Sequence, residues 1–162
     1  MGCASEMQSK LPVIEFTKEN LDPNFNSWIS TRENVELFDL PIETKVLDTS
    51  EYPGHGFLGQ QPLVPLYETL GIENATTPHG VHKFTNLMWP NGNDSFCESI
   101  RKYSELVGEF DQIVMRMVSE SYGTEKDYET ILGSMTYLLK LFKYRGPKEH
   151  EKKVGLSPHT DK

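Results

Sequence analysis

The run Met135-Thr136-Tyr137-Leu138-Leu139-Lys140-Leu141-Phe142-Lys143-Tyr144 is rich in leucine, tyrosine and phenylalanine and predicts a β-strand. Arg145-Gly146-Pro147 ends it, because proline donates no backbone N–H to a sheet. Residues 148–153 are charged and predict a hairpin-like loop, after which Val154-Gly155-Leu156-Ser157 begins another strand. The last part of the sequence therefore predicts the beginning of a β-sheet.

Before this sheet, the sequence predicts a long helix from about Ser95 to Tyr122. Asn93, Asp94 or Ser95 is suited to cap its N-terminus, and Gly123 to end it. Side chains three and four residues apart form one stripe along it, which we expect to pack against a core: Leu106, Phe110, Ile113, Val114, Met117 and Ser121.

Other elements are shorter. The sequence predicts strands over 11–16 and 84–89, and helices over 32–39 (capped by Thr31) and 126–132. Residues 48–65 contain several prolines and glycines and predict an irregular loop, and 66–80 show little periodicity.

Composition excludes several classes of function. The 162 residues are 36% hydrophobic, as expected of one globular domain, and carry a net charge of −8 without a basic patch. Binding to nucleic acid, or to a membrane through basic residues, is therefore not expected. No apolar run is long enough to span a membrane. Two cysteines and no apolar leader at the start favour a cytoplasmic protein.

His159 and Asp161 form the pattern with the clearest chemistry. Residues i and i+2 of a strand point to the same face, so an imidazole and a carboxylate project side by side. They make up two of the three ligands in the 2-His-1-carboxylate site of non-haem Fe(II) oxygenases. The spacing alone leaves open that they are two exposed polar residues.

Five stretches together resemble a known family: residues 11–16, 36–45, 85–90, 137–144 and 155–162. In this order they are similar to the plant 2-oxoglutarate- and Fe(II)-dependent dioxygenases. Within that family, the sequence is most similar to the subgroup of the glucosinolate side-chain oxygenases. Two runs carry this similarity: Lys-Tyr-Arg-Gly-Pro at 143–147 and the final His-Thr-Asp-Lys.

The resemblance implies an α+β fold, in which a helical N-terminal region precedes the first strands of a double-stranded β-helix, or jelly roll. Residues 1–125 would be the N-terminal region and 126–162 the start of the barrel. In such an enzyme His159 and Asp161 bind Fe(II) and Tyr144 contacts 2-oxoglutarate. The reaction is hydroxylation or desaturation of a small plant metabolite or hormone.

The sequence departs from the family in two places. An early helix and strand are missing between Trp28 and Glu36, which suggests an internal deletion near 28–36. No residue corresponds to the second iron-binding histidine or to the arginine that binds 2-oxoglutarate. We therefore expect a truncated, inactive form of the oxygenase. The alternatives are a non-catalytic splice or gene remnant that acts only as an interaction module or not at all, and an unrelated helical protein.

The remaining histidines have weaker predictions. Pro78 and Gly80 favour a loop around His79 and His82, without a metal site. His55 lies in a turn that the family places near the mouth of the barrel, where a side chain is able to face substrate.

Overall fold

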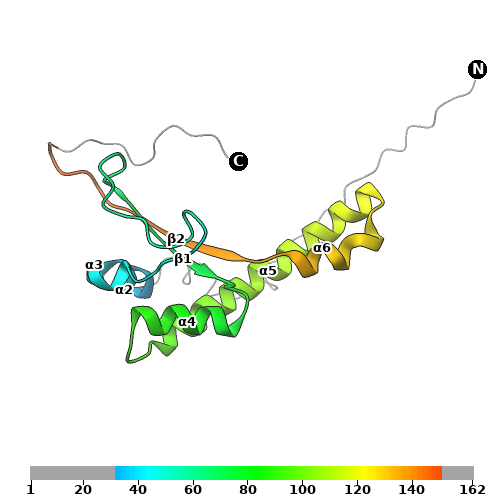
Figure 1. Cartoon of the computed structure of the whole chain (residues 1–162), viewed down its shortest axis with the longest axis horizontal. Helices are drawn as coiled ribbons and strands as arrows, with labels where there is room; N and C mark the ends of the chain where they lie inside the picture. The colour runs from blue at the N-terminus through cyan, green and yellow to red at the C-terminus, as the bar shows by residue number, and fades with distance from the viewer. Residues whose placement is uncertain (1–31, 151–162) are drawn as a thin grey trace, which may run out of the picture. The chain divides into compact units, whose positions relative to one another are not determined.

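The structure, a computed structural model, describes residues 32–150, which belong to one compact unit. The predicted strands at 11–16 and 154–157, His159 and Asp161 lie outside the described residues. In chain order the elements are α2 (Arg32–Asp39), α3 (Ile42–Lys45), β1 (Tyr67–Glu73), α4 (Pro78–Met88), α5 (Asp94–Tyr122), η1 (Glu125–Asp127), α6 (Tyr128–Ser134) and β2 (Leu138–Tyr144) (Figure 1).

The sheet joins two segments that are far apart in the sequence. β1 and β2 pair antiparallel along their whole length, from Tyr67 opposite Tyr144 to Glu73 opposite Leu138. β2 confirms the predicted strand, although it begins at Leu138 and not at Met135. β1 was not predicted, because its central residues are buried on both sides and so show no alternation of polar and apolar side chains.

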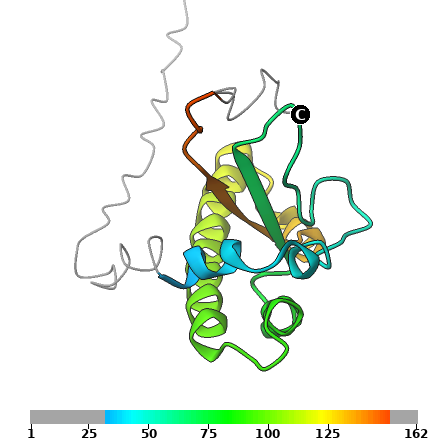
Figure 2. The ribbon, with the colours of Figure 1, turned by 90° about the vertical axis from the view of Figure 1, so that its left-hand side faces the viewer.

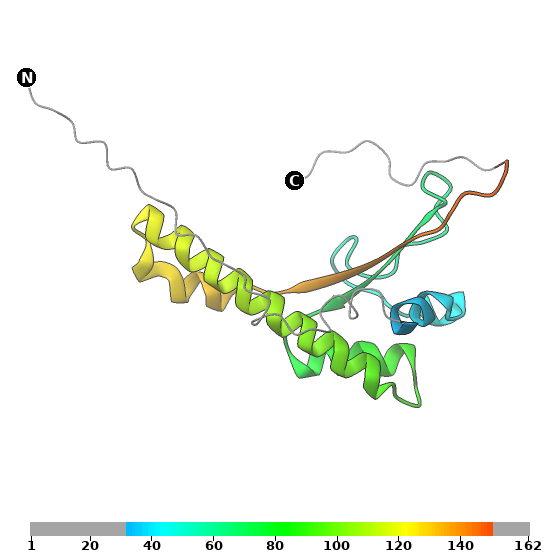
Figure 3. The same cartoon turned by 180° about the vertical axis from the view of Figure 1, so that it is seen from behind.

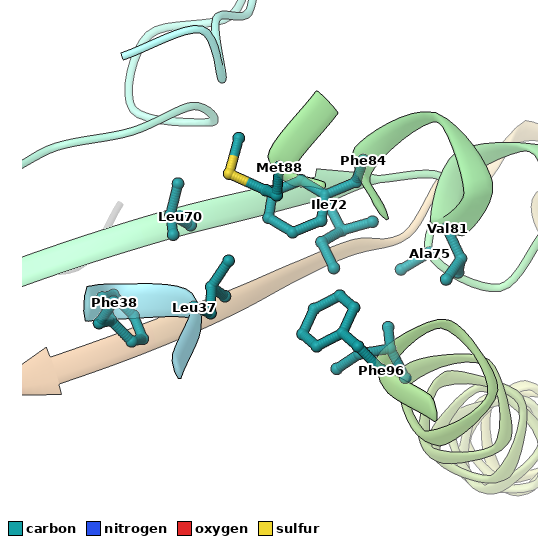
Figure 4. Packing of buried hydrophobic residues seen from close by; sticks show 10 residues of the cluster. Leu37, Phe38, Leu70, Ile72, Ala75, Val81, Phe84, Met88 and Phe96 are labelled. Atoms are coloured by element: carbon teal, nitrogen blue, oxygen red, sulfur yellow. The ribbon is translucent and has the colours of Figure 1, made fainter. Parts of the chain in front are cut away.

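The hydrophobic core lies on one face of this sheet. Leu70 and Ile72 of β1, supported by Leu139 and Leu141 of β2, pack against α2, α4 and α5 (Figure 4). Phe96 of α5 is almost fully buried in it, with its ring 6.0 Å from that of Phe84 and 4.7 Å from that of Trp89. Apolar burial of this kind supplies most of the stability of a small domain.

The strand predicted over 84–89 is wrong, because these residues form the end of α4 and the turn after it. The Thr77 side chain accepts a hydrogen bond from the Gly80 N–H at 3.1 Å, and Pro78 occupies the first turn. Proline is favoured there because its missing N–H would have no helical partner. The loop predicted around His79 and His82 is wrong for the same reason.

The predicted long helix is confirmed as α5, but its expected buried stripe is wrong. The Asn93 side chain caps the helix by accepting from the Phe96 N–H at 3.1 Å, and Gly123 ends it at φ 66°. The buried positions are instead Phe96, Ile100, Ser104, Gly108 and Ser119. Small residues at 104 and 108 let the helix approach its neighbours, since a Cβ at Gly108 would lie 2.9 Å from Thr76 Cγ2.

The shorter helices agree with prediction. α2 has the predicted bounds, and η1 with α6 covers the predicted helix over 126–132. Pro41 separates α2 from the single turn of α3. Among residues 32–150, no helix has both the length and the apolar character needed to cross a membrane.

Candidate functional site

The sheet has a second face, turned away from the core. Alternation along the strands places on it Tyr67, Thr69, Gly71 and Glu73 of β1 and Leu138, Lys140, Phe142 and Tyr144 of β2. We call this the outer face. The loop 48–58 covers its β1 part, whereas Phe142 and Tyr144 on β2 are each 55% exposed.

Tyr144, the predicted contact for 2-oxoglutarate, ends β2 on the outer face. Its ring centre lies 5.0 Å from that of Tyr67, which also stacks on Phe142 at 5.9 Å. Burial, and secondarily the neighbouring Tyr144, raises the pKa of the Tyr67 phenol. Within the described residues the Tyr144 hydroxyl has no hydrogen-bond partner, so it remains able to donate to a ligand carboxylate.

The loop 48–58 takes the place of a third strand beside β1. The backbone of Leu58 exchanges hydrogen bonds of 2.9 and 2.8 Å with Thr69, and Asp48 Oδ2 accepts one of 2.9 Å from the Gly71 N–H. Glycine is required at the two closest approaches. A Cβ on Gly71 would overlap the His55 carbonyl oxygen, and one on Gly56 would overlap the Asp48 carbonyl oxygen.

Asp48 is a buried carboxyl group at the base of this loop. Burial raises its pKa to about 6, against the lowering effects of the Gly71 hydrogen bond and the Lys140 charge. Burial also lowers the pKa of Lys140, and the negative charge of Asp48 partly offsets this lowering. Lys140 Nζ donates to the Gly54 carbonyl and so ties β2 to the loop.

A second polar group lies at the end of β1, where Glu73 meets the loop. Glu73 accepts a hydrogen bond from Ser50 Oγ, and its Oε1 lies 3.3 Å from His55 Nδ1. The Ser50 hydrogen bond, followed by the interactions with His55, holds the pKa of Glu73 below its usual value. His55 therefore binds a carboxylate of its own chain.

An open pocket of about 240 Å³ lies between the loop and α4. Its polar lining includes Asp48, Glu73, His55, His79 and Lys83, so the structure brings together two histidines that are distant in sequence. Nevertheless, among residues 32–150 no three His, Cys, Asp or Glu side chains are arranged to hold a metal ion.

Sequence reasoning missed Asp48 and Glu73. Neither residue belongs to a motif. Their environment arises because the loop 48–58 pairs with β1, a strand that the sequence did not predict. The only sequence signal was the glycine-rich character of 48–65, which does not identify the partner of the loop.

The arrangement of these elements occurs in a plant dioxygenase of known structure. The chain superposes with a TM-score of 0.70 and 26% identity on the dioxygenase for auxin oxidation 1 from Arabidopsis thaliana in its binary complex with 2-oxoglutarate. The match covers 83% of this chain and 50% of that enzyme. The fold is thus part of a dioxygenase fold. The predicted α+β class is confirmed, with a jelly roll represented among the described residues by two strands.

Sequence comparison gives the same class. The chain is 35% identical to the probable 2-oxoglutarate-dependent dioxygenase AOP1.2 of Arabidopsis thaliana, over 94% of this chain and 58% of that protein. It is 30% identical to the 2-oxoglutarate-dependent dioxygenase AOP2 of the same plant, over 94% of this chain and 42% of that protein. No family model matches. The chain is homologous to the plant 2-oxoglutarate-dependent dioxygenases, which confirms the predicted resemblance.

The match is partial in two respects. The chain spans little more than half of AOP1.2. The alignment with AOP1.2 is 189 positions long, which exceeds the 162 residues of the chain, so this relative contains residues that have no counterpart here.

Proposed function

We propose that these 162 residues supply the N-terminal region and the first barrel strands of an Fe(II)- and 2-oxoglutarate-dependent dioxygenase acting on a small plant metabolite or hormone. The observation that carries the proposal is homology to such dioxygenases over 94% of the chain, together with the shared fold. A cytoplasmic location and the division at residue 125 remain predictions.

In this proposal His159 and Asp161 are two of the iron ligands. Their side chains lie outside the described residues, so the support comes from the His-x-Asp spacing and its position after the β2 strand. Bound iron would supply the activation of O₂ in the complete site. The chain's own contribution is to hold an imidazole and a carboxylate on one strand face.

Tyr144 is the proposed contact for 2-oxoglutarate. Support comes from its position on the outer face, its exposure of 55% and its hydroxyl, which lacks a partner within residues 32–150. One neutral hydrogen bond is a modest contact for a dicarboxylate, because a bidentate arginine pair is stronger. The orientation of the ring is supported by Tyr67 at 5.0 Å.

We further propose that the 162 residues by themselves bind iron weakly and do not turn over. No residue of the sequence is assignable to the second iron-binding histidine or to the 2-oxoglutarate arginine. The extra residues in the alignment with AOP1.2 support an internal deletion, although they do not locate it. The second candidate is therefore a non-catalytic product, for which the exposed outer face is the favouring observation.

Two measurements on the purified chain test these proposals. Anaerobic titration with Fe(II) should show weak binding that His159→Ala and Asp161→Ala both reduce, whereas His150→Ala should leave it unchanged. Binding that neither substitution affects would contradict the ligand assignment. Iron-dependent formation of succinate from 2-oxoglutarate would contradict the proposed lack of turnover.

A further inference from the structure

We propose that the pocket between the loop 48–58 and α4 binds a small molecule that carries a protonated amine, and that Asp48 is the group that accepts a hydrogen bond from this amine. The proposal does not depend on the dioxygenase reaction. It depends on a carboxylate oxygen without a partner, on the charges around that oxygen and on the apolar wall of the pocket.

Asp48 is almost fully buried, yet only one of its carboxylate oxygens is hydrogen-bonded. The residue is 7% exposed, and its Oδ2 accepts from the Gly71 N–H at 2.9 Å. Within residues 32–150, Oδ1 has no hydrogen-bond partner, and it is not enclosed in the interior as Ser104 Oγ is. Because Asp48 lines the pocket, a ligand there is able to donate to Oδ1. A donor with a positive charge is favoured, since charge-assisted hydrogen bonds are the strong ones.

Glu73 supplies a second acceptor in the same pocket. Its Oε1 accepts from Ser50 Oγ and lies 3.3 Å from His55 Nδ1, whereas Oε2 has no partner within the described part of the chain. Burial is the main cause that raises the pKa of Asp48, and the charge of Glu73 adds to it. An ammonium group in the pocket would be attracted by both carboxylates and would reduce the repulsion between them.

The positive groups near the pocket are less suited to hold an anion. His79 and Lys83 on α4 are exposed, so water screens their charge. The Gly80 N–H, in the first turn of α4, donates to the side chain that caps this helix. Lys140 of β2 donates to the Gly54 carbonyl. The buried charge in the pocket is therefore that of a carboxylate, which favours a cation.

The shape of the pocket limits the size of the ligand. Its volume of about 240 Å³ is below that of sites for drug-sized molecules. Leu47, Phe84 and Leu87 supply apolar lining, so a short aliphatic chain is able to contact them while its amine reaches Asp48. Figure 2 shows α4 and the loop 48–58 on the β1 side of the sheet, which places the pocket at the β1 edge, apart from β2.

Titration of the 162-residue chain with n-butylammonium chloride tests the proposal. At pH 7 the amine is protonated and Asp48 is mostly ionised. The Gly71 amide is the NMR reporter, because its N–H is bonded to Asp48. We expect a saturable shift of its resonance, with a dissociation constant on the order of millimolar for so small a probe. Butyrate and n-butanol, which lack the positive charge, should bind roughly tenfold or more weakly.

Two substitutions should change the affinity for butylammonium in opposite directions. Asp48→Asn keeps an acceptor for the Gly71 N–H but turns an N–H toward the ligand, so the dissociation constant should rise roughly tenfold or more. Lys83→Gln removes a repelling charge and should lower the dissociation constant by at most about a few fold, because this lysine is exposed. Asp39→Asn, at a surface carboxylate paired with Lys143, is the matched control and should leave it unchanged.

Three results would overturn the proposal. The absence of a saturable shift would indicate that water alone occupies the pocket. Binding of butyrate that Lys83→Gln abolishes would indicate a site for anions. Butylammonium binding that persists in Asp48→Asn would indicate that the amine binds elsewhere on this acidic chain. Asp48→Asn removes a buried charge and is expected to remain folded, which its amide spectrum checks.

Discussion

The two sides of the sheet have the same strand length but different surroundings (Figure 3). On the β1 side, the loop 48–58 pairs with the strand edge. The first half of α5 is packed in the core. On the β2 side, the edge has no partner among the described residues, and the second half of α5 exposes most of its apolar side chains.

The difference shows how a short sheet is completed without a further strand. Leu58 supplies one pair of backbone hydrogen bonds and Asp48 supplies a side-chain acceptor, so both backbone groups of Thr69 and the N–H of Gly71 have partners. Because burying an unpaired backbone group is costly, this loop permits β1 to lie in the interior. Among residues 32–150, no loop covers β2 in this way.

The largest expected effect compares two phenylalanines on α5. Phe96→Ala should lower the free energy of unfolding by about 3–5 kcal/mol, because the ring is almost fully buried in the core. Phe110→Ala should cost under about 1 kcal/mol, since Phe110 is 41% exposed. Urea unfolding measures both. Equal losses would show that the second half of α5 is packed as tightly as the first.

The second-largest expected effect on stability concerns the loop 48–58, which covers the edge of β1. Gly71→Ala places a Cβ against the His55 carbonyl, so the loop must move and its hydrogen bonds to β1 weaken. We expect a loss of about 2–3 kcal/mol in the free energy of unfolding, typical of overpacking against backbone. Gly133→Ala is the control, because the space around it is open and alanine favours a helix. If both variants were equally stable, the close approach of the loop would be incorrect.

A smaller effect, dependent on pH, concerns Asp48. Its pKa is about 6 in the folded chain and 3.8 for the free side chain, so between these values the folded state binds more protons. The free energy of unfolding therefore falls as pH rises from about 4 to about 6 and stays lower above that window. Asp48→Asn keeps an acceptor for the Gly71 N–H but cannot ionise.

At pH 7 we expect Asp48→Asn to be more stable than the natural chain by on the order of 2 kcal/mol, with the two nearly equal at pH 4. Urea titrations at several pH values measure the difference. Asp39→Asn, at a carboxylate that pairs with Lys143 on the surface, should not reproduce this pH dependence. A difference that grows toward low pH would have the wrong sign for a buried carboxyl.

The smallest expected effect on stability concerns Ser104, a buried residue in the first half of α5. Ser104 Oγ is buried and has no hydrogen-bond partner within residues 32–150. Ser104→Ala should therefore raise the thermal midpoint, with a gain of about 0.5–1 kcal/mol, because an unsatisfied hydroxyl is removed from the interior. Ser121→Ala, on the exposed end of the helix, should show no such gain. A destabilised Ser104→Ala would indicate that the hydroxyl has a partner.

The sequence by itself determined the elements whose signals are local. Asn93 and Gly123 marked the ends of α5, and the run before Arg145-Gly146-Pro147 marked β2, because caps, turns and strand composition act within a few residues. It also indicated the resemblance to the plant 2-oxoglutarate-dependent dioxygenases, to which the chain is homologous. The roles of His159 and Asp161 remain predictions.

The tertiary structure alone decided which surfaces are buried. The regular apolar stripe through Phe110 and Ile113 is exposed, while Ser104 and Gly108 are buried, because the approach of a helix to its neighbours depends on side-chain size as well as hydrophobicity. β1 and the carboxyl of Asp48 likewise acquired their environment only when the loop 48–58 folded onto the strand. Such contacts join segments distant in sequence, so no local pattern encodes them.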